Sequence, residues 1–181
     1  MLRVLLSTII GGITLLNAPD QQASLKPEAE EYAVYSVLVN DLSVRERAQL
    51  VLIIDHTDNP SIAGLVSPDS ALPELIQSYL LKAASPVRLE KEFKLASKYQ
   101  LISEQESASM SSGPPTVTLS RVGFNSRRDK ALVYFACRKS ETFKREQFVI
   151  MIKGPEGWKV GRSVVRFLQS ASNNRLQPTA R

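Results

Sequence analysis

The spacing of apolar residues predicts a helix near the start of the chain and a second helix further on. Tyr32, Tyr35, Val39 and Leu42 recur at steps of three and four residues, which gives a helix over residues 27–42 one apolar face. Pro27 stands at the first helical position, where its missing N–H costs nothing. Acidic side chains complement the helix dipole in the first turn: Glu28, Glu30 and Glu31.

The second predicted helix covers residues 72–84 and stops before Pro86. Its inward positions are Leu75, Ile76, Tyr79 and Leu80. Between the two helices, residues 49–55 form a continuous apolar run that is typical of a buried strand, and the turn-forming residues 56–60 end it.

The last third of the chain has a strand-like pattern. After a short strand at 99–103, a single helical turn at 104–110 and a break at 111–115, four runs follow at 116–124, 130–138, 146–153 and 158–167. The connections at 125–129 and 154–157 suit hairpins. The apolar phase shifts between Leu119 and Val122, which predicts a bulge near Ser120 and Arg121.

This order of elements predicts an α+β domain. The N-terminal helices are expected to pack on one side of a curved antiparallel β-meander of about four to five strands, in a cystatin-like or nuclear-transport-factor-like outline. We expect one domain over residues 27–168, followed by a disordered polar tail at 169–181. An outline of this kind implies no function by itself.

The N-terminus has the order of residues found in secretory signals. Arg3 is followed by an uncharged, mostly apolar run at 4–16, and then by Ala18. The run is shorter than the roughly 20 residues that cross a bilayer. We therefore predict a signal peptide at 1–18, with cleavage after Ala18 or Ala23, and an exported protein, periplasmic or extracellular. The alternatives are an uncleaved membrane anchor, and a buried strand or helix of a cytoplasmic protein.

Composition narrows the class of partner. The 181 residues are 43% apolar and 23% charged, as in an ordinary soluble domain. The net charge of +5 falls to +2, with 20 basic and 18 acidic residues, once Arg3, Arg175 and Arg181 outside the predicted domain are set aside. We expect no nucleic-acid partner, because such binding needs a clustered basic surface. The single cysteine, Cys137, excludes an intramolecular disulfide and a multi-thiolate zinc site.

His56 is the one histidine, with Asp55 and Asp58 beside it. A catalytic relay would use His56 with one of these aspartates and a serine such as Ser120 as the nucleophile. Asp55 could orient His56 only if the strand has ended, because adjacent strand residues point to opposite faces. A strand-end turn is the simpler interpretation, and a metal site would lack a second histidine. We therefore assign no catalytic residue from the sequence, and we expect no metal and no cofactor.

Four other features have a structural and a functional interpretation. Cys137 lies in an apolar strand and is expected to be a buried, unreactive thiol. Arg121 could hold an anionic ligand, but a buried ion pair with a carboxylate such as Asp55 is favoured. Tyr134 is a second ligand-binding candidate. The basic residues of the hairpins are expected to be solvated: Arg127, Arg128, Lys139, Lys144 and Arg145.

Several segments together carry a resemblance. TLSRVGFN at 118–125, ALVY at 131–134 and the hairpin from Phe148 to Val160 follow EYAVY at 31–35 and IDHT at 54–57. This pattern is similar to a group of small, uncharacterised exported bacterial proteins, over most of residues 28–165. The resemblance implies export and the architecture given above, and no activity. The group carries a glycine- and cysteine-rich hairpin where this chain has residues 137–145.

Three functional hypotheses follow. The leading one is an exported, non-enzymatic domain that binds a protein, a peptide or a small ligand through the sheet's open face or its hairpins, with the membrane involved only through the N-terminal segment. The second is a hydrolase-like or metal-assisted enzyme that uses His56 with Asp55 or Asp58. The third is a cytoplasmic, cone-shaped domain that binds a small ligand.

Overall fold

The structure is a computed structural model, and it describes residues 26–62, 71–140 and 143–170, the last nine of these by their backbone. The predicted signal peptide at 1–18 lies outside the described residues, as do positions 171–181 of the predicted tail. Residues 169 and 170 still belong to the last strand. Among the described helices, none has the length and apolar composition that crossing a bilayer takes.

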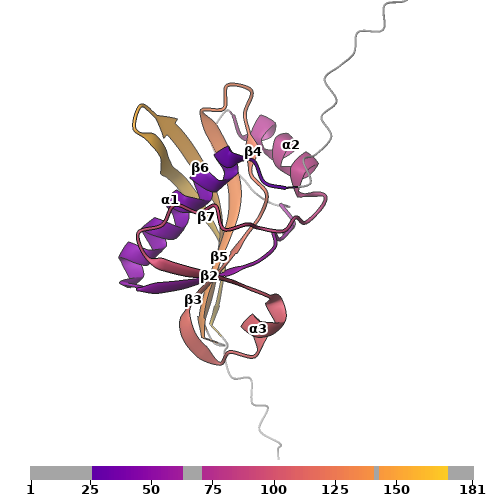
Figure 1. The fold of residues 1–181 in the computed structure, drawn as a ribbon. Coiled ribbons are helices and arrows are strands. Elements are labelled where there is room, and N and C mark those ends of the chain that lie inside the picture. Colours follow the sequence, from indigo (N-terminus) through magenta and orange to yellow (C-terminus); the bar gives the residue numbers. More distant parts are fainter. Residues whose placement is uncertain (1–25, 63–70, 141–142, 171–181) are drawn as a thin grey trace, which may run out of the picture.

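Helices and strands alternate as far as the third helix, which ends at Ala108, and the elements after it are all strands (Figure 1). The elements are α1 (Ala29–Glu46), β1 (Leu50–Ile54), α2 (Leu72–Ala83), β2 (Lys98–Ile102), α3 (Glu104–Ala108), β3 (Ser112–Leu119), β4 (Gly123–Phe124), β5 (Lys130–Ser140), β6 (Phe143–Gly154) and β7 (Gly157–Ser170). The two long predicted helices, the strand at 49–55 and the short strand near 99–103 are confirmed.

Helix α1 is fixed at both ends by local hydrogen bonding. At its start, Glu28 and Glu31 form a reciprocal capping box, in which each side chain accepts from the other residue's backbone N–H. At its end, Arg47 adopts a left-handed conformation with φ of 52°, and its N–H bonds back to the last turn. The helix therefore runs four residues beyond its predicted end at residue 42.

The seven strands form one mixed sheet, in the order β2-β1-β3-β5-β6-β7, with β4 paired to β5. Strand β1 pairs in parallel with both β2 and β3, and the remaining pairs are antiparallel. The α+β class is confirmed, but the prediction of a purely antiparallel meander of four to five strands is wrong. An apolar run such as β1 shows that a strand is buried and leaves its direction open. The cystatin-like or nuclear-transport-factor-like outline stays a prediction.

The helices cover opposite faces of the sheet, which corrects the prediction that they pack on one side. Val133 and Phe135 of β5 join the core under α1, whereas Leu132 and Tyr134 join the core under α2. All residues of β5 from Ala131 to Cys137 are buried, as expected for a strand covered on both faces. Burial of each large apolar side chain contributes about 1.5–3 kcal/mol to the free energy of unfolding.

The predicted strand at 116–124 is two strands, with a break where the bulge was expected. Strand β3 ends at Leu119 and β4 begins at Gly123. A Cβ atom at Gly123 would lie 2.4 Å from the Tyr79 backbone nitrogen, so only glycine allows α2 to approach β4 this closely. Pro114 and Pro115, predicted as a break, lie inside β3 instead, at a register shift where their missing N–H groups interrupt the pairing with β5.

A row of polar side chains on α1 holds the segment at residues 87–97. Tyr32 and Ser36 accept from the backbone N–H groups of Glu90 and Lys94, at 2.6 and 2.9 Å. Asn40 both donates to the Lys94 carbonyl and accepts from the Ala96 N–H. The segment is therefore anchored without a helix or a strand of its own, apart from an isolated bridge between Arg88 and His56. Leu89 and Phe93 from this segment enter the core.

Candidate functional site

The predicted histidine site lies just past the end of β1. Because β1 ends at Ile54, Asp55 and His56 are not held to strand alternation, and His56 Nδ1 lies 3.0 Å from Asp55 Oδ1. On the other side of the ring, Nε2 lies 3.6 Å from Glu104 Oε1 at the start of α3. The imidazole is therefore held between two carboxylates and remains half-exposed.

Ser120 and Asp58 do not join His56 in a relay. The Ser120 hydroxyl is fully buried, donates to the Arg121 carbonyl at 2.8 Å and accepts from the Tyr134 N–H at 2.9 Å. Asp58 accepts from the N–H of Asn59 and pairs with Ser120 in an isolated bridge, and His56 pairs in the same way with Arg88. The segment after β1 is therefore a bend with two bridges, where a turn was the simpler interpretation. Within residues 26–62, 71–140 and 143–170, no group of three or more metal-ligating side chains is placed to hold a metal ion.

The most densely bonded polar group in the core is Glu31 of α1. Its carboxylate accepts from Arg121 Nη2 at 2.8 Å and Nε at 3.0 Å, from the Val122 N–H at 2.9 Å and from the Tyr35 hydroxyl at 3.2 Å. Both side chains of the ion pair are buried, with 0% and 1% exposed. The prediction that Arg121 makes a structural ion pair is therefore confirmed, but its partner is Glu31, not Asp55.

The electrostatics of this group depend on full pairing of the carboxylate. Burial would raise the pKa of Glu31, but the hydrogen bonds from Arg121 and Val122 and the nearby charge of Lys82 outweigh it, so the pKa lies below its usual range. Burial and the neighbouring Glu31 charge raise the pKa of Tyr35 well above its usual value. Glu31 thus stays ionised and Tyr35 stays a hydrogen-bond donor, an arrangement that holds α1 to the β3–β4 break.

The other two glutamates of the first turn bind different elements. Glu28 bridges Lys82 of α2 and Arg128 of the β4–β5 hairpin, each at 2.6 Å. Glu30 accepts from Lys153 of β6 and from the Trp158 indole N–H of β7, each at 2.7 Å. From the sequence, these two glutamates were expected only to complement the dipole of the helix. They also join the start of α1 to both hairpins.

Tyr134 and Cys137 are both buried in β5. The Tyr134 ring packs against Phe148 with 5.5 Å between centroids, in the core under α2, so it does not line an open ligand site. Cys137 is 3% exposed, and burial raises the pKa of its thiol to about 11. The prediction of a buried thiol is confirmed.

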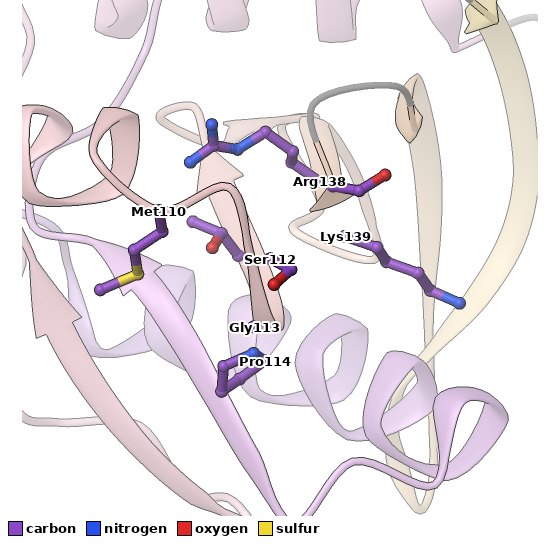
Figure 2. A pocket seen from close by; sticks show the side chains of 8 residues that line it. Met110, Ser112, Gly113, Pro114, Arg138 and Lys139 are labelled. Carbon is purple, nitrogen blue, oxygen red and sulfur yellow. The ribbon is translucent and has the colours of Figure 1, made fainter.

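A small hollow lies where β3 begins and β5 ends, and Figure 2 shows its lining. Arg138 and Lys139 leave β5 in opposite directions (Figure 2), Arg138 to bind Ser107 of α3 and Lys139 to bind Glu46 of α1. The hollow has a volume of about 10 Å³, which is room for one water molecule. It is therefore too small for an organic ligand.

The outer edge of β7 is the most extended backbone surface of the sheet. β7 is the last strand in the sheet order and pairs with β6 from Gly157 to Ser170. In the part of the chain that the structure describes, no strand pairs with its other edge. Helix α1 packs alongside β7, where Trp158 is buried and Val160 is 41% exposed.

Two register shifts place an extra residue on β7, at Gly161 and at Arg166. Bulges of this kind twist an edge and limit unselective pairing. Gly161 has no room for a side chain, because a Cβ atom there would lie 2.8 Å from the Ile152 side chain and 2.9 Å from the Ile150 carbonyl. The edge is therefore divided into short straight runs, and Gly157 to Val160 form the first.

Sequence reasoning missed the role of Glu31, although a signal was present. Glu31, Tyr35, Leu38 and Leu42 follow one another at helical spacing, so Glu31 lies on the buried stripe of α1. A carboxylate on such a stripe needs a buried cation. Arg121, an arginine inside an apolar run, is the buried cation that pairs with Glu31. No comparable signal in the sequence indicated that β7 lies at the edge of the sheet, because the pattern of apolar residues in a strand does not determine the order of strands.

Comparison of the chain with protein-family models, with curated proteins and with solved structures finds no match in any of the three.

Proposed function

We propose that the protein is an exported, non-enzymatic binding domain that binds an extended segment of a partner protein along the outer edge of β7. The observation that carries this proposal is the edge itself, the outer side of a strand that runs from Gly157 to Ser170 at the end of the sheet order. The unpaired N–H and C=O groups of an edge strand are a template for one more strand.

The side chains around the first straight run, Gly157 to Val160, favour binding of a partner segment over exposure of this edge to solvent. Val160 is 41% exposed and pairs with Met151, a residue of the core under α1, so an added strand would cover apolar surface on that face. The Glu30–Trp158 hydrogen bond fixes α1 beside this run. A preformed, rigid edge lowers the ordering cost of binding.

The binding half of the proposal is tested by selecting peptides from a random displayed library against the full chain, and by mapping the bound peptides with amide hydrogen exchange. Binding is expected to slow exchange in β7 and to be lost in Val160→Asp. Val44→Asp is the matched control, because it makes the same change at a valine of α1 that is 77% exposed. Selected peptides that protect another element, or that bind Val160→Asp unchanged, would overturn the proposal.

The export half is tested separately by cell fractionation and intact mass of the untagged protein in a bacterial host. A periplasmic species cleaved after Ala18 or Ala23 is expected. A full-length cytoplasmic species would contradict export. The proposal that β7 binds a partner segment would then depend only on the peptide-binding test.

A further inference from the structure

We propose that the segment that binds β7 alternates apolar and acidic residues. This inference rests on the proposed function, and it assigns the chemistry of the partner. Over Gly157–Ser170 the sequence has three basic residues, Lys159, Arg162 and Arg166, and no acidic residue. A strand that pairs with this edge is favoured by carboxylates, since opposite charges on neighbouring strands attract.

The two faces of the edge differ in what they offer. On the α1 face, Trp158 and Val160 stand opposite Lys153 and Met151 of β6, and Met151 belongs to the core under α1. On the other face, Ile152 lies between Lys159 of β7 and Lys130 of β5 in one cross-strand row. The exposed Lys159 is therefore the first basic group that an added strand meets on that face.

Because side chains alternate along a strand, these two faces predict the residue pattern of the added strand. Successive side chains of an added strand would point alternately to the α1 face, where valine-sized apolar groups fit beside Val160, and to the face of Lys159, where carboxylates fit. The same charge disfavours a second copy of the chain as the occupant. Pairing β7 with β7 would bring the basic residues of two strands together, and like charges placed across strands destabilise the pair.

The test uses synthetic peptides of four alternating valine–glutamate pairs, with acetylated and amidated ends. One comparison peptide replaces glutamate by lysine, and another has the valines and glutamates in two blocks. We expect the alternating valine–glutamate peptide to bind best and to slow exchange in β7. Lys159→Glu should weaken this preference, because Arg162 and Arg166 remain in the strand. The change should be roughly threefold per unit of altered charge, or about tenfold for lysine to glutamate. Lys91→Glu, at an exposed lysine in the 87–97 segment, is the matched control.

The outcomes separate this inference from the proposed function. If displayed peptides protect β7 but the glutamate and lysine peptides bind equally, the acidic pattern is wrong and strand addition stands. If Lys91→Glu acts as strongly as Lys159→Glu, the effect is unspecific attraction and the inference falls. If no peptide protects β7, both fall. Sedimentation velocity that shows a dimer with β7 protected would identify a second copy as the occupant, and would contradict the acidic partner.

Discussion

Glu31 and Arg121 lie 90 residues apart in the chain and meet inside the core, with 2.8 Å between Arg121 Nη2 and Glu31 Oε1. The pair joins the first turn of α1 to the break between β3 and β4, and the Tyr35 hydroxyl shares its one proton between Glu31, at 3.2 Å, and the Ser120 carbonyl, at 2.8 Å. Sequence separation of this size makes the contact a tertiary one that local segments cannot form alone.

Removing one partner of this pair is expected to cost far more than removing both. Arg121→Met leaves the Glu31 carboxylate buried without its main donor, and the free energy of unfolding should fall by about 3–5 kcal/mol. The double variant Glu31→Met/Arg121→Met should lose much less than the sum of the single variants. Urea denaturation of the four proteins measures the cycle.

Lys153→Met is the matched control for that cycle, because its ion pair with Glu30 is half-exposed. We expect it to change the free energy of unfolding by less than about 1 kcal/mol. Additive losses in the Glu31 and Arg121 variants would show that the two side chains do not act as a pair.

The stability of the protein should fall in acid. Hydrogen bonds and nearby cations outweigh burial and hold the pKa values of Glu28 and Glu31 below the usual 4.5, and hydrogen bonds from Lys153 and Trp158 lower that of Glu30. A carboxylate with a lowered folded-state pKa contributes stability above 4.5, and that contribution is lost as the pH falls through its folded-state value. Denaturation between pH 7 and pH 3 should therefore show a decreasing free energy of unfolding below about pH 4.5.

Glu31→Gln tests the assignment of this pH dependence. The variant should be less stable at pH 7 and should show a shallower decrease toward pH 3, since one of the three carboxylates no longer titrates. An unchanged slope would mean that Glu31 does not contribute to the acid response.

Gln147 of β6 is a site where substitution should stabilise the protein. Its side chain is 5% exposed, and its Oε1 is the one buried side-chain oxygen without a hydrogen-bond partner among the described residues. Gln147→Leu removes this unsatisfied acceptor at similar volume and should raise the free energy of unfolding by about 1 kcal/mol. Gln147→Glu should lower it, because it places a charge in the same environment. A loss of stability in Gln147→Leu would contradict this account.

Cys137 should react slowly with thiol reagents in the folded protein. Burial raises its pKa to about 11, so at pH 8 very little of the thiol is ionised, and the side chain is 3% exposed. Labelling with iodoacetamide should be at least about tenfold slower in the native protein than in urea. Equal rates in the two states would show that β5 is not protected as the structure describes.

The elements that sequence reasoning predicted correctly are those with a strong local pattern. The heptad-like spacing of Tyr32, Tyr35, Val39 and Leu42 predicts α1, and the unbroken apolar run of β1 predicts a buried strand. Turn chemistry at residues 154–157 predicts the β6–β7 hairpin, where Gly157 has a φ of 104°. In each case neighbouring residues alone determine the local structure.

The features that were predicted wrongly from the sequence depend on contacts between distant segments. The parallel pairing of β1 with β2 and β3, and the placement of α1 and α2 on opposite faces, follow from chain connections that local periodicity does not encode. Asp55 was named as an example of the carboxylate that would pair with Arg121, and the partner is Glu31 for the same reason. A buried guanidinium requires a carboxylate, but only the tertiary fold selects which one.

Amide hydrogen exchange across β6 and β7, in the full-length protein without a partner, shows directly whether the outer edge of β7 is free. Every β6 amide has a neighbouring strand on one side or the other, whereas alternate amides of an edge strand point outward. We therefore expect alternate amides of Gly157–Ser170 to exchange rapidly while those of Phe143–Gly154 stay protected. Uniform protection across β7 would mean that its edge is already covered, and would contradict the proposal that this edge receives a partner strand.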